Sequence, residues 1–230
     1  MSFQALKEEV YEANLQLPAK NLVIYTWGNV SGIDANREVI AIKPSGVAYD
    51  ELRPDDIVLV DLDGHAIEKG LKPSSDTRTH VVLYQRFKNI KGICHTHSTH
   101  ATAWAQAARP IPCFGTTQAD YVDGEVPCIP VLSDEQINRD YERETGYQIA
   151  NYFDQRDPMT SPMVIMAGHA PFTWGSSPAD AVYHAAVLEE VAKMAWMTLS
   201  INPDAQPLKT SLIDKHYQRK HGCDAYYGQR

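Results

Sequence analysis

Residues 92–107 read GICHTHSTHATAWAQA, and this stretch joins two predicted elements of different type. The apolar start at Gly92 predicts a short strand that runs through two histidines. Thr99 belongs to the residue types that cap helices, so the alanine-rich segment after it is predicted to be a helix. A strand followed so closely by a helix is typical of an α/β domain.

Apolar spacing predicts further elements on both sides of this stretch. Apolar residues spaced three and four apart indicate helices over residues 3–17, 77–87, 140–153, 178–200 and 208–221. Strand-length apolar runs begin at Leu22, Val39, Ile57 and Met163, and PFTWG after the last of them continues or returns as another strand. One α/β domain over residues 1–230 is expected, with a partly antiparallel sheet covered by helices.

Composition narrows the class of protein. The chain has 230 residues, 43% of them hydrophobic, which is enough for one domain with a sizeable core. The formal net charge of -8 argues against a nucleic-acid-coating surface or a polybasic membrane anchor. The N-terminus does not resemble a signal peptide, no apolar run reaches membrane-spanning length, and the four cysteines form no CxxC pair. A cytoplasmic protein is therefore expected.

The two histidines of the opening stretch are the sharpest chemical signal. Side chains alternate between the faces of a strand, so His95 and His97 should point the same way, about 6–7 Å apart. Two imidazoles in that arrangement can bind one metal ion, although a pair of surface histidines is an equally simple interpretation. Cys94 should face the other way, as a small buried hydrophobic residue.

A metal site needs further ligands, and two residues elsewhere are suitable. His169 follows the apolar run that starts at Met163, so it lies at a strand end. Asp76 starts the predicted helix over residues 77–87, where an aspartate is also a common N-cap. Three histidines and one carboxylate suit Zn²⁺, with Mn²⁺ and Co²⁺ as alternatives. Sequence spacing alone does not show that these residues meet.

Small polar segments suggest anion binding. Backbone N–H and hydroxyl groups could surround a phosphate at Gly28-Asn29, Ser45-Gly46 and Ser74-Ser75. Each segment taken alone is equally an ordinary turn. Asp120 and Tyr227 are acid/base candidates by residue type, although a lone loop aspartate or a tail tyrosine usually has no such role.

Motifs along the chain resemble one known family: TWGNVS, IKPSG, PSSDTRTH, HTHSTHATAWAQA, GTTQADY, GHAPFTWG, and DKHYQRKHG followed by AYYGQ. In this order and at these intervals they resemble the L-ribulose-5-phosphate 4-epimerases of the class II aldolase/adducin superfamily. The similarity runs from about Asn14 to Gln229. Within the family, the segments KPSGVAY, HSTHATAWAQA and VAKMAWM most resemble the branch that acts in L-ascorbate utilisation.

The resemblance implies a single class II aldolase-like domain with a largely antiparallel central β-sheet and helices on both sides. It implies one bivalent metal ion per subunit, usually Zn²⁺, bound by Asp76, His95, His97 and His169. It implies a phosphate site formed by Gly28, Asn29, Lys43, Ser45, Gly46, Ser74 and Ser75. Asp120 and Tyr227 match the acid/base positions, and His216 and Arg219 match tail positions near them.

The resemblance also implies a homotetramer whose active sites lie at subunit interfaces, with the tail over residues 208–230 reaching a neighbouring subunit. On this interpretation Asp120 comes from one chain and Tyr227 from the next. The activity implied is interconversion of L-ribulose 5-phosphate and D-xylulose 5-phosphate by cleavage and re-formation of the C3–C4 bond.

Two alternative functions stay open, and two motifs differ from the family pattern. A sugar-phosphate aldolase of the same superfamily usually has Glu where this chain has Asp76, and a non-catalytic adducin-like module is expected to lose metal ligands. The family usually reads GTTHADY and HGPFAWG, whereas this chain has Gln118, Ala170 and Thr173. Gln118 lies two residues from Asp120, so it is expected to tune that carboxylate.

Overall fold

A seven-stranded mixed sheet forms the centre of the computed structural model, which describes residues 2–226. In chain order the elements are α1 (Phe3–Ala19), β1 (Asn29–Ile33), β2 (Ile40–Ile42), η1 (Pro54–Asp56), β3 (Val58–Val60), α2 (Thr77–Arg86), β4 (Gly92–His95), α3 (Thr99–Gln106), α4 (Thr116–Ala119), β5 (Cys128–Ile129), α5 (Asp134–Tyr152), η2 (Pro158–Thr160), β6 (Met163–Met166), β7 (Pro171–Gly175), α6 (Pro178–Ile201) and α7 (Thr210–His221).

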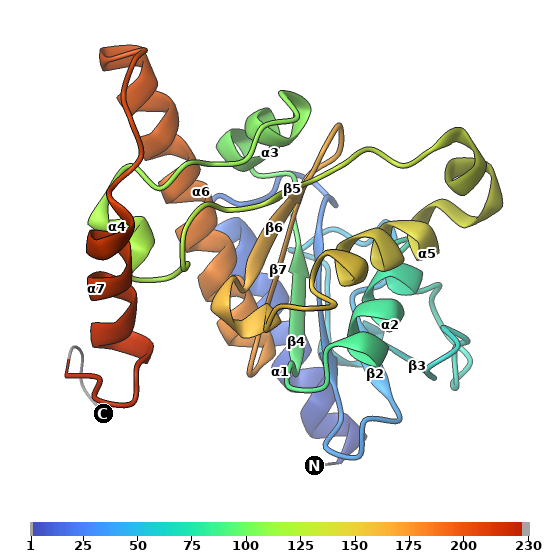
Figure 1. The fold of residues 1–230 in the computed structure, drawn as a ribbon. Coiled ribbons are helices and arrows are strands. Elements are labelled where there is room, and N and C mark those ends of the chain that lie inside the picture. Colours follow the sequence, from blue (N-terminus) through green and yellow to red (C-terminus); the bar gives the residue numbers. More distant parts are fainter. Residues whose placement is uncertain (1, 227–230) are drawn as a thin grey trace.

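The strand order is β3-β2-β1-β4-β7-β6-β5, and every neighbouring pair is antiparallel except β5 and β6. Helices α1 and α6 cover one face of the sheet, and α2 and α5 cover the other (Figure 1). The predicted α/β class, with a largely antiparallel sheet between helices, is confirmed.

Alternation along β4 sends successive side chains into different layers. Ile93 joins the core cluster that includes residues of α2 and α5, whereas Cys94 packs with residues of α1 and α6. His95 then points to the same side as Ile93, where its ring stacks on Phe172 with centroids 4.2 Å apart. The expectation that Cys94 is a buried apolar residue facing away from His95 is confirmed.

Three predicted elements differ in the structure. The run that begins at Leu22 is not a strand, because Asn21 and Tyr25 have positive φ values of 55° and 54°, which belong to turns. Strand β4 ends at His95, so His97 lies beyond the strand. Helix α5 begins earlier than predicted, because Ser133 caps it and forms a capping box with Gln136.

The C-terminal helix lies apart from the sheet. Helix α7 packs against the short helix α4 of its own chain, where Ile213 contacts a cluster formed by Cys113 and Ala119 (Figure 1). Tyr227 lies outside the described residues. Among residues 2–226, no helix combines the length and the apolar character that crossing a membrane requires.

Candidate active site

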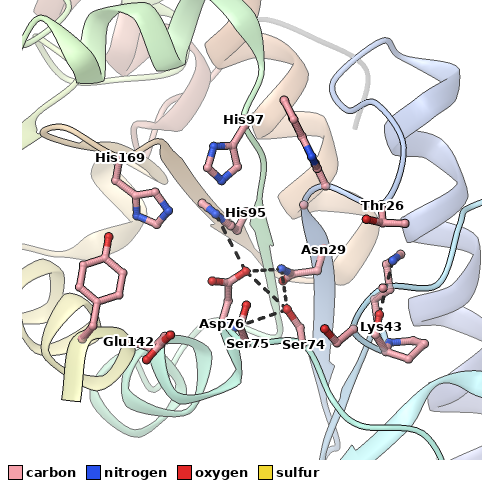
Figure 2. Close-up of a pocket in the computed structure, with 16 residues that line it drawn as sticks. Thr26, Asn29, Lys43, Ser74, Ser75, Asp76, His95, His97, Glu142 and His169 are labelled. Atoms are coloured by element: carbon pink, nitrogen blue, oxygen red, sulfur yellow. Dashed lines mark hydrogen bonds and ion pairs between the residues drawn. The ribbon is translucent and has the colours of Figure 1, made fainter.

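A pocket of about 570 Å³ lies where β1 starts and β4 ends (Figure 2). Asn29 of β1 is paired with His95 of β4, so the sheet register itself brings two distant segments to this place. The sequence-predicted residues that line it are Gly28, Asn29, Lys43, Ser45, Gly46, Ser74, Ser75, Asp76, His95, His97 and His169.

Three histidines form a cluster in this pocket. His95 is the last residue of β4, His97 follows it, and His169 lies in the turn between β6 and β7. One ring nitrogen from each residue lies within 4.8 Å of the others. Their ring centroids are 4.9, 5.0 and 5.3 Å apart, so the three rings surround one small volume (Figure 2).

The carboxylate of Asp76 lies beside this group, in the same pocket. Asp76 occupies the N-cap position of α2, yet its carboxylate accepts no capping hydrogen bond from the amides of the described helix. Instead Asn29 donates from Nδ2 to Oδ2 of Asp76 at 2.7 Å. Burial opposes the charged form, but His95, His80 and the Asn29 amide together keep the pKa of the Asp76 carboxyl below its usual value.

The orientation of His95 leaves one nitrogen facing this carboxylate. Its Nδ1–H donates to the carbonyl oxygen of Pro171 at 2.9 Å, a contact that fixes the tautomer and the ring plane. The Nε2 atom lies 4.0 Å from Oδ2 of Asp76. With Nδ1 bonded to Pro171, Nε2 is the ring atom of His95 that is available to a metal ion.

The protonation states of the other two histidines also suit a cation site. Burial and the neighbouring imidazoles lower the pKa of His97 and of His169 to about 4, so both rings are neutral at neutral pH. Within the described residues, the buried Nδ1 of His169 has no hydrogen-bond partner. Three imidazoles with a carboxylate beside them are a set of ligand types that fits Zn²⁺.

A second group of possible donors is of a different kind. Asp61, Asp63 and His65 lie in the exposed turn after β3. Oδ1 of Asp61 already accepts the backbone N–H groups of Asp63 and His65, both at 2.9 Å. This group is an Asx-type turn.

The predicted anion-binding segments converge on the other side of the same pocket. Gly28-Asn29, Ser45-Gly46 and Ser74-Ser75 come from three different loops, and all of them line it. Lys43 is 1% exposed overall, and its Nζ donates to the carbonyl oxygen of Val47 at 2.6 Å. Burial lowers the pKa of Lys43 to about 8, so the ammonium stays mostly charged at neutral pH.

Gly28 shows why this side of the pocket needs a glycine. Its φ is +72°, a conformation that other residues rarely adopt. A Cβ atom there would lie 2.8 Å from the carbonyl oxygen of His95. The loop that carries Gly28 therefore packs directly on the end of β4, next to the histidine cluster.

Five pocket residues were not predicted individually from the sequence: Thr26, Trp27, Pro44, Tyr141 and Glu142. Tyr141 and Glu142 belong to α5, where the helix breaks at Asp140, whose φ and ψ are -169° and 84°. Arg78 of α2 donates to Asp140 at 2.8 Å, and Thr79 donates to the carbonyl oxygen of Glu142 at 2.6 Å. Helical periodicity gives no sign of such a break.

Asp120 belongs to a separate cluster. Its carboxylate accepts hydrogen bonds from His216 at 3.1 Å and from Arg219 at 3.1 and 2.8 Å. Burial disfavours its charge, but these two donors lower the pKa of Asp120 below its usual value. Among the described residues that line the pocket, none belongs to this cluster. Figure 1 places α4 and α7 far from α2 and α5.

Gln118 has a structural contact that its sequence position did not reveal. Its side chain is 4% exposed and donates from Nε2 to the carbonyl oxygens of Ile111 and Gly124, both at 3.1 Å. These contacts fix the loop segments on either side of α4. The expectation that Gln118 tunes Asp120 stays a prediction.

The fold and the pocket agree with the comparisons to known proteins. The family profile described as the Class II Aldolase and Adducin N-terminal domain matches residues 8–196. The chain belongs to this family. Among curated relatives, L-ribulose-5-phosphate 4-epimerase UlaF of Salmonella paratyphi C (strain RKS4594) is 51% identical over 227 residues, covering 99% of this chain and 100% of that protein. The protein of the same name from Salmonella typhi is 50% identical with the same coverage.

Solved structures give the same architecture. A structure titled L-fuculose 1-phosphate aldolase superposes with a TM-score of 0.79 at 23% identity, covering 94% of this chain and 95% of that one. YgbL of Klebsiella pneumoniae, titled a putative aldolase/epimerase/decarboxylase, has a TM-score of 0.74 at 26% identity, covering 94% and 99%. The resemblance drawn from the sequence motifs is confirmed.

Proposed function

We propose that this chain interconverts L-ribulose 5-phosphate and D-xylulose 5-phosphate as a metal-dependent epimerase. One observation carries the proposal: a single pocket joins a cation-binding donor set to three loops suited to a phosphate. The full-length relatives named L-ribulose-5-phosphate 4-epimerase UlaF support the same substrate pair.

The two sides of the pocket suit the two ends of such a substrate. The loops at Gly28, Ser45 and Ser74, with the Lys43 ammonium, would bind the phosphate at C5. Asp76, His95, His97 and His169 would bind a bivalent cation, with Zn²⁺ as the first choice and Mn²⁺ or Co²⁺ as alternatives. When bound, this ion supplies Lewis-acid stabilisation of the negative charge that develops on the sugar oxygens.

Bond cleavage explains why both sides are needed. The hydrogen on C4 is not adjacent to the C2 carbonyl, so its direct removal as a proton is difficult. Cleavage of the C3–C4 bond, with removal of the C4 hydroxyl proton, gives glycolaldehyde phosphate and the enediolate of dihydroxyacetone, which keeps the bonding electrons on C3. The aldehyde can then turn, C3 attacks its other face, and the C4 oxygen takes up a proton again. The loops around Lys43 would retain this fragment through its phosphate during the turn, as an epimerase requires.

The acid/base groups belong, in this proposal, to a second copy of the chain. Asp120 lies outside the pocket of its own chain and is bonded to His216 and Arg219. We therefore propose that this cluster and the tail over residues 208–230 together complete the pocket of a neighbouring subunit in a homotetramer. Tyr227 is the second proposed acid/base residue, and it lies outside the described residues.

The sharing between subunits differs in detail from the expectation drawn from the sequence. That expectation placed Asp120 and the tail on different chains. Because α7 packs on α4 of its own chain, we instead assign Asp120 and α7 to the same subunit.

The four free cysteines, two of them buried, fit the reducing cytoplasm in which we place the enzyme.

Incubation of the Zn²⁺-loaded protein with L-ribulose 5-phosphate tests this function. D-xylulose 5-phosphate should form, and a chelator should stop its formation. Cleavage of L-fuculose 1-phosphate with no epimerisation would favour the aldolase alternative instead. The absence of any turnover, together with the absence of bound metal, would favour the adducin-like interaction module.

A further inference from the structure

Tyr49 lies behind the anion-binding side of the pocket. It belongs to the loop between β2 and η1 and is 7% exposed. Among the described residues, it is not one of those that line the pocket. Its contacts nevertheless reach two of the three loops that do, so it is well placed to act on them from within the core.

The hydroxyl of Tyr49 contacts the first of these loops. Its single O–H is shared between the carbonyl oxygens of Trp27 and Gly28, at 2.7 and 3.0 Å. In a trans peptide the carbonyl and the N–H point in opposite directions. A donor that binds both carbonyls from the core side therefore turns the N–H groups of Gly28 and Asn29 away from the core.

The ring of Tyr49 contacts the second loop through Lys43. The Nζ atom of Lys43 lies 4.7 Å from the ring centroid, within the range of a cation–π interaction. The same Nζ donates to Val47, two residues before Tyr49. The ammonium is thus held between a ring face and a carbonyl oxygen, at a fixed place beside the pocket.

We propose that Tyr49 is a positioning residue of the phosphate site. Tyr49 fixes the position of the Trp27–Gly28 backbone relative to the Lys43 ammonium. This inference rests on the proposed function, because it assumes that the anion in the pocket is the phosphate of a sugar. Tyr49 acts through its neighbours and does not touch the substrate. Its effect should therefore fall on the binding of the phosphate.

Two substitutions separate the two contacts. Tyr49→Phe keeps the ring near Lys43 but removes the hydroxyl that binds the loop carbonyls. Tyr49→Leu removes both. Tyr84→Phe is the matched control, because its hydroxyl is also buried and lies 2.9 Å from a serine hydroxyl, that of Ser31, away from the phosphate loops.

The first measurement is the Kd of inorganic phosphate for each protein at neutral pH, after a chelator has removed any metal. Tyr49→Phe should weaken phosphate binding by roughly fivefold to tenfold, in line with the loss of a buried hydrogen bond. Tyr49→Leu should weaken it further. Tyr84→Phe should leave the Kd unchanged while lowering the unfolding midpoint about as much as Tyr49→Phe does.

The second measurement is turnover of L-ribulose 5-phosphate by the metal-loaded proteins. Tyr49→Phe should raise KM by a factor similar to the change in Kd and should change kcat much less. Equal phosphate affinity in wild type and Tyr49→Phe would overturn the inference, and so would an equal loss in Tyr84→Phe. If the wild type turns over no pentulose phosphate but Tyr49→Phe still loses phosphate affinity, the proposed function fails and the positioning role stands.

Discussion

The Nε2 atom of His95 lies 4.0 Å from the Oδ2 atom of Asp76, while Nδ1 of the same ring donates to the carbonyl oxygen of Pro171. A metal ligand must be unprotonated at the atom that binds the ion, and the Nδ1 contact leaves Nε2 as that atom. Asn29 and the carbonyl of Pro171 hold this arrangement from outside. A bivalent cation bound between the two atoms would have both of them as ligands.

Removal of one imidazole should therefore remove the metal. His97→Asn should weaken metal binding by more than about 100-fold, the upper range for residues that merely support a ligand. His65→Asn is the control, since His65 lies in the exposed turn with Asp61 and Asp63. Elemental analysis after dialysis checks both. A His97→Asn protein that retains metal at the wild-type level would contradict this assignment.

Anion affinity should fall as the pH rises through the pKa of Lys43. Burial lowers this pKa to about 8, so the ammonium is mostly charged at about pH 7 and mostly neutral at about pH 9. Sulfate keeps its charge over this range, and its affinity should fall up to about tenfold. Lys43→Met should bind sulfate weakly and without this pH dependence. A wild-type affinity that is flat over the range would exclude Lys43 as the anion contact.

Gln118 should contribute to stability. Gln118→Ala leaves the carbonyl oxygens of Ile111 and Gly124 without this donor, which should cost about 2 kcal/mol of the free energy of unfolding. Gln206→Ala is the control, because Gln206 is exposed and its contact with Asp204 is local. Urea unfolding checks both. If the cost of Gln118→Ala is no greater than that of the control, the contacts are not stabilising.

Two inactive variants should restore activity to each other when they share an oligomer. His97→Asn damages the pocket, and Asp120→Asn damages the cluster on α4. If the active site joins the pocket of one chain to the cluster of the next, about a quarter of the sites in a random cyclic mixture regain both intact halves. Co-expression with two different tags isolates the mixed oligomers. Mixed oligomers without activity would show that a single chain supplies both halves.

Most of the fold could be predicted from local sequence because its signals are local. Ser177 and Pro178 mark the start of α6, and Ser177 does cap it. The strand at Gly92 and the helix after Thr99 follow from side-chain type and spacing. The prediction of a strand at Leu22 was wrong because its apolar residues suit a strand, whereas Asn21 and Tyr25 adopt positive φ values that apolar spacing does not reveal.

The site was harder to predict because contact depends on tertiary structure. The rings of His95 and His97 do lie close together, as strand alternation predicted. However, β4 ends at His95, so the position of His97 is set by the loop after the strand. Asp76 stands at a helix start, and only the structure distinguishes a capping carboxylate from one that faces His95. At the break in α5 that precedes Glu142, Asp140 accepts a hydrogen bond from Arg78, which lies far away in sequence.

The central claim is that this pocket inverts C4 by breaking and re-forming the C3–C4 bond. Turnover of L-ribulose 5-phosphate in deuterium oxide, followed by proton NMR, tests it most directly. The account predicts D-xylulose 5-phosphate that retains its original hydrogen at C4, because that hydrogen stays on the aldehyde throughout. Deuterium at C4 of the product, or no D-xylulose 5-phosphate from metal-loaded protein, would contradict the account.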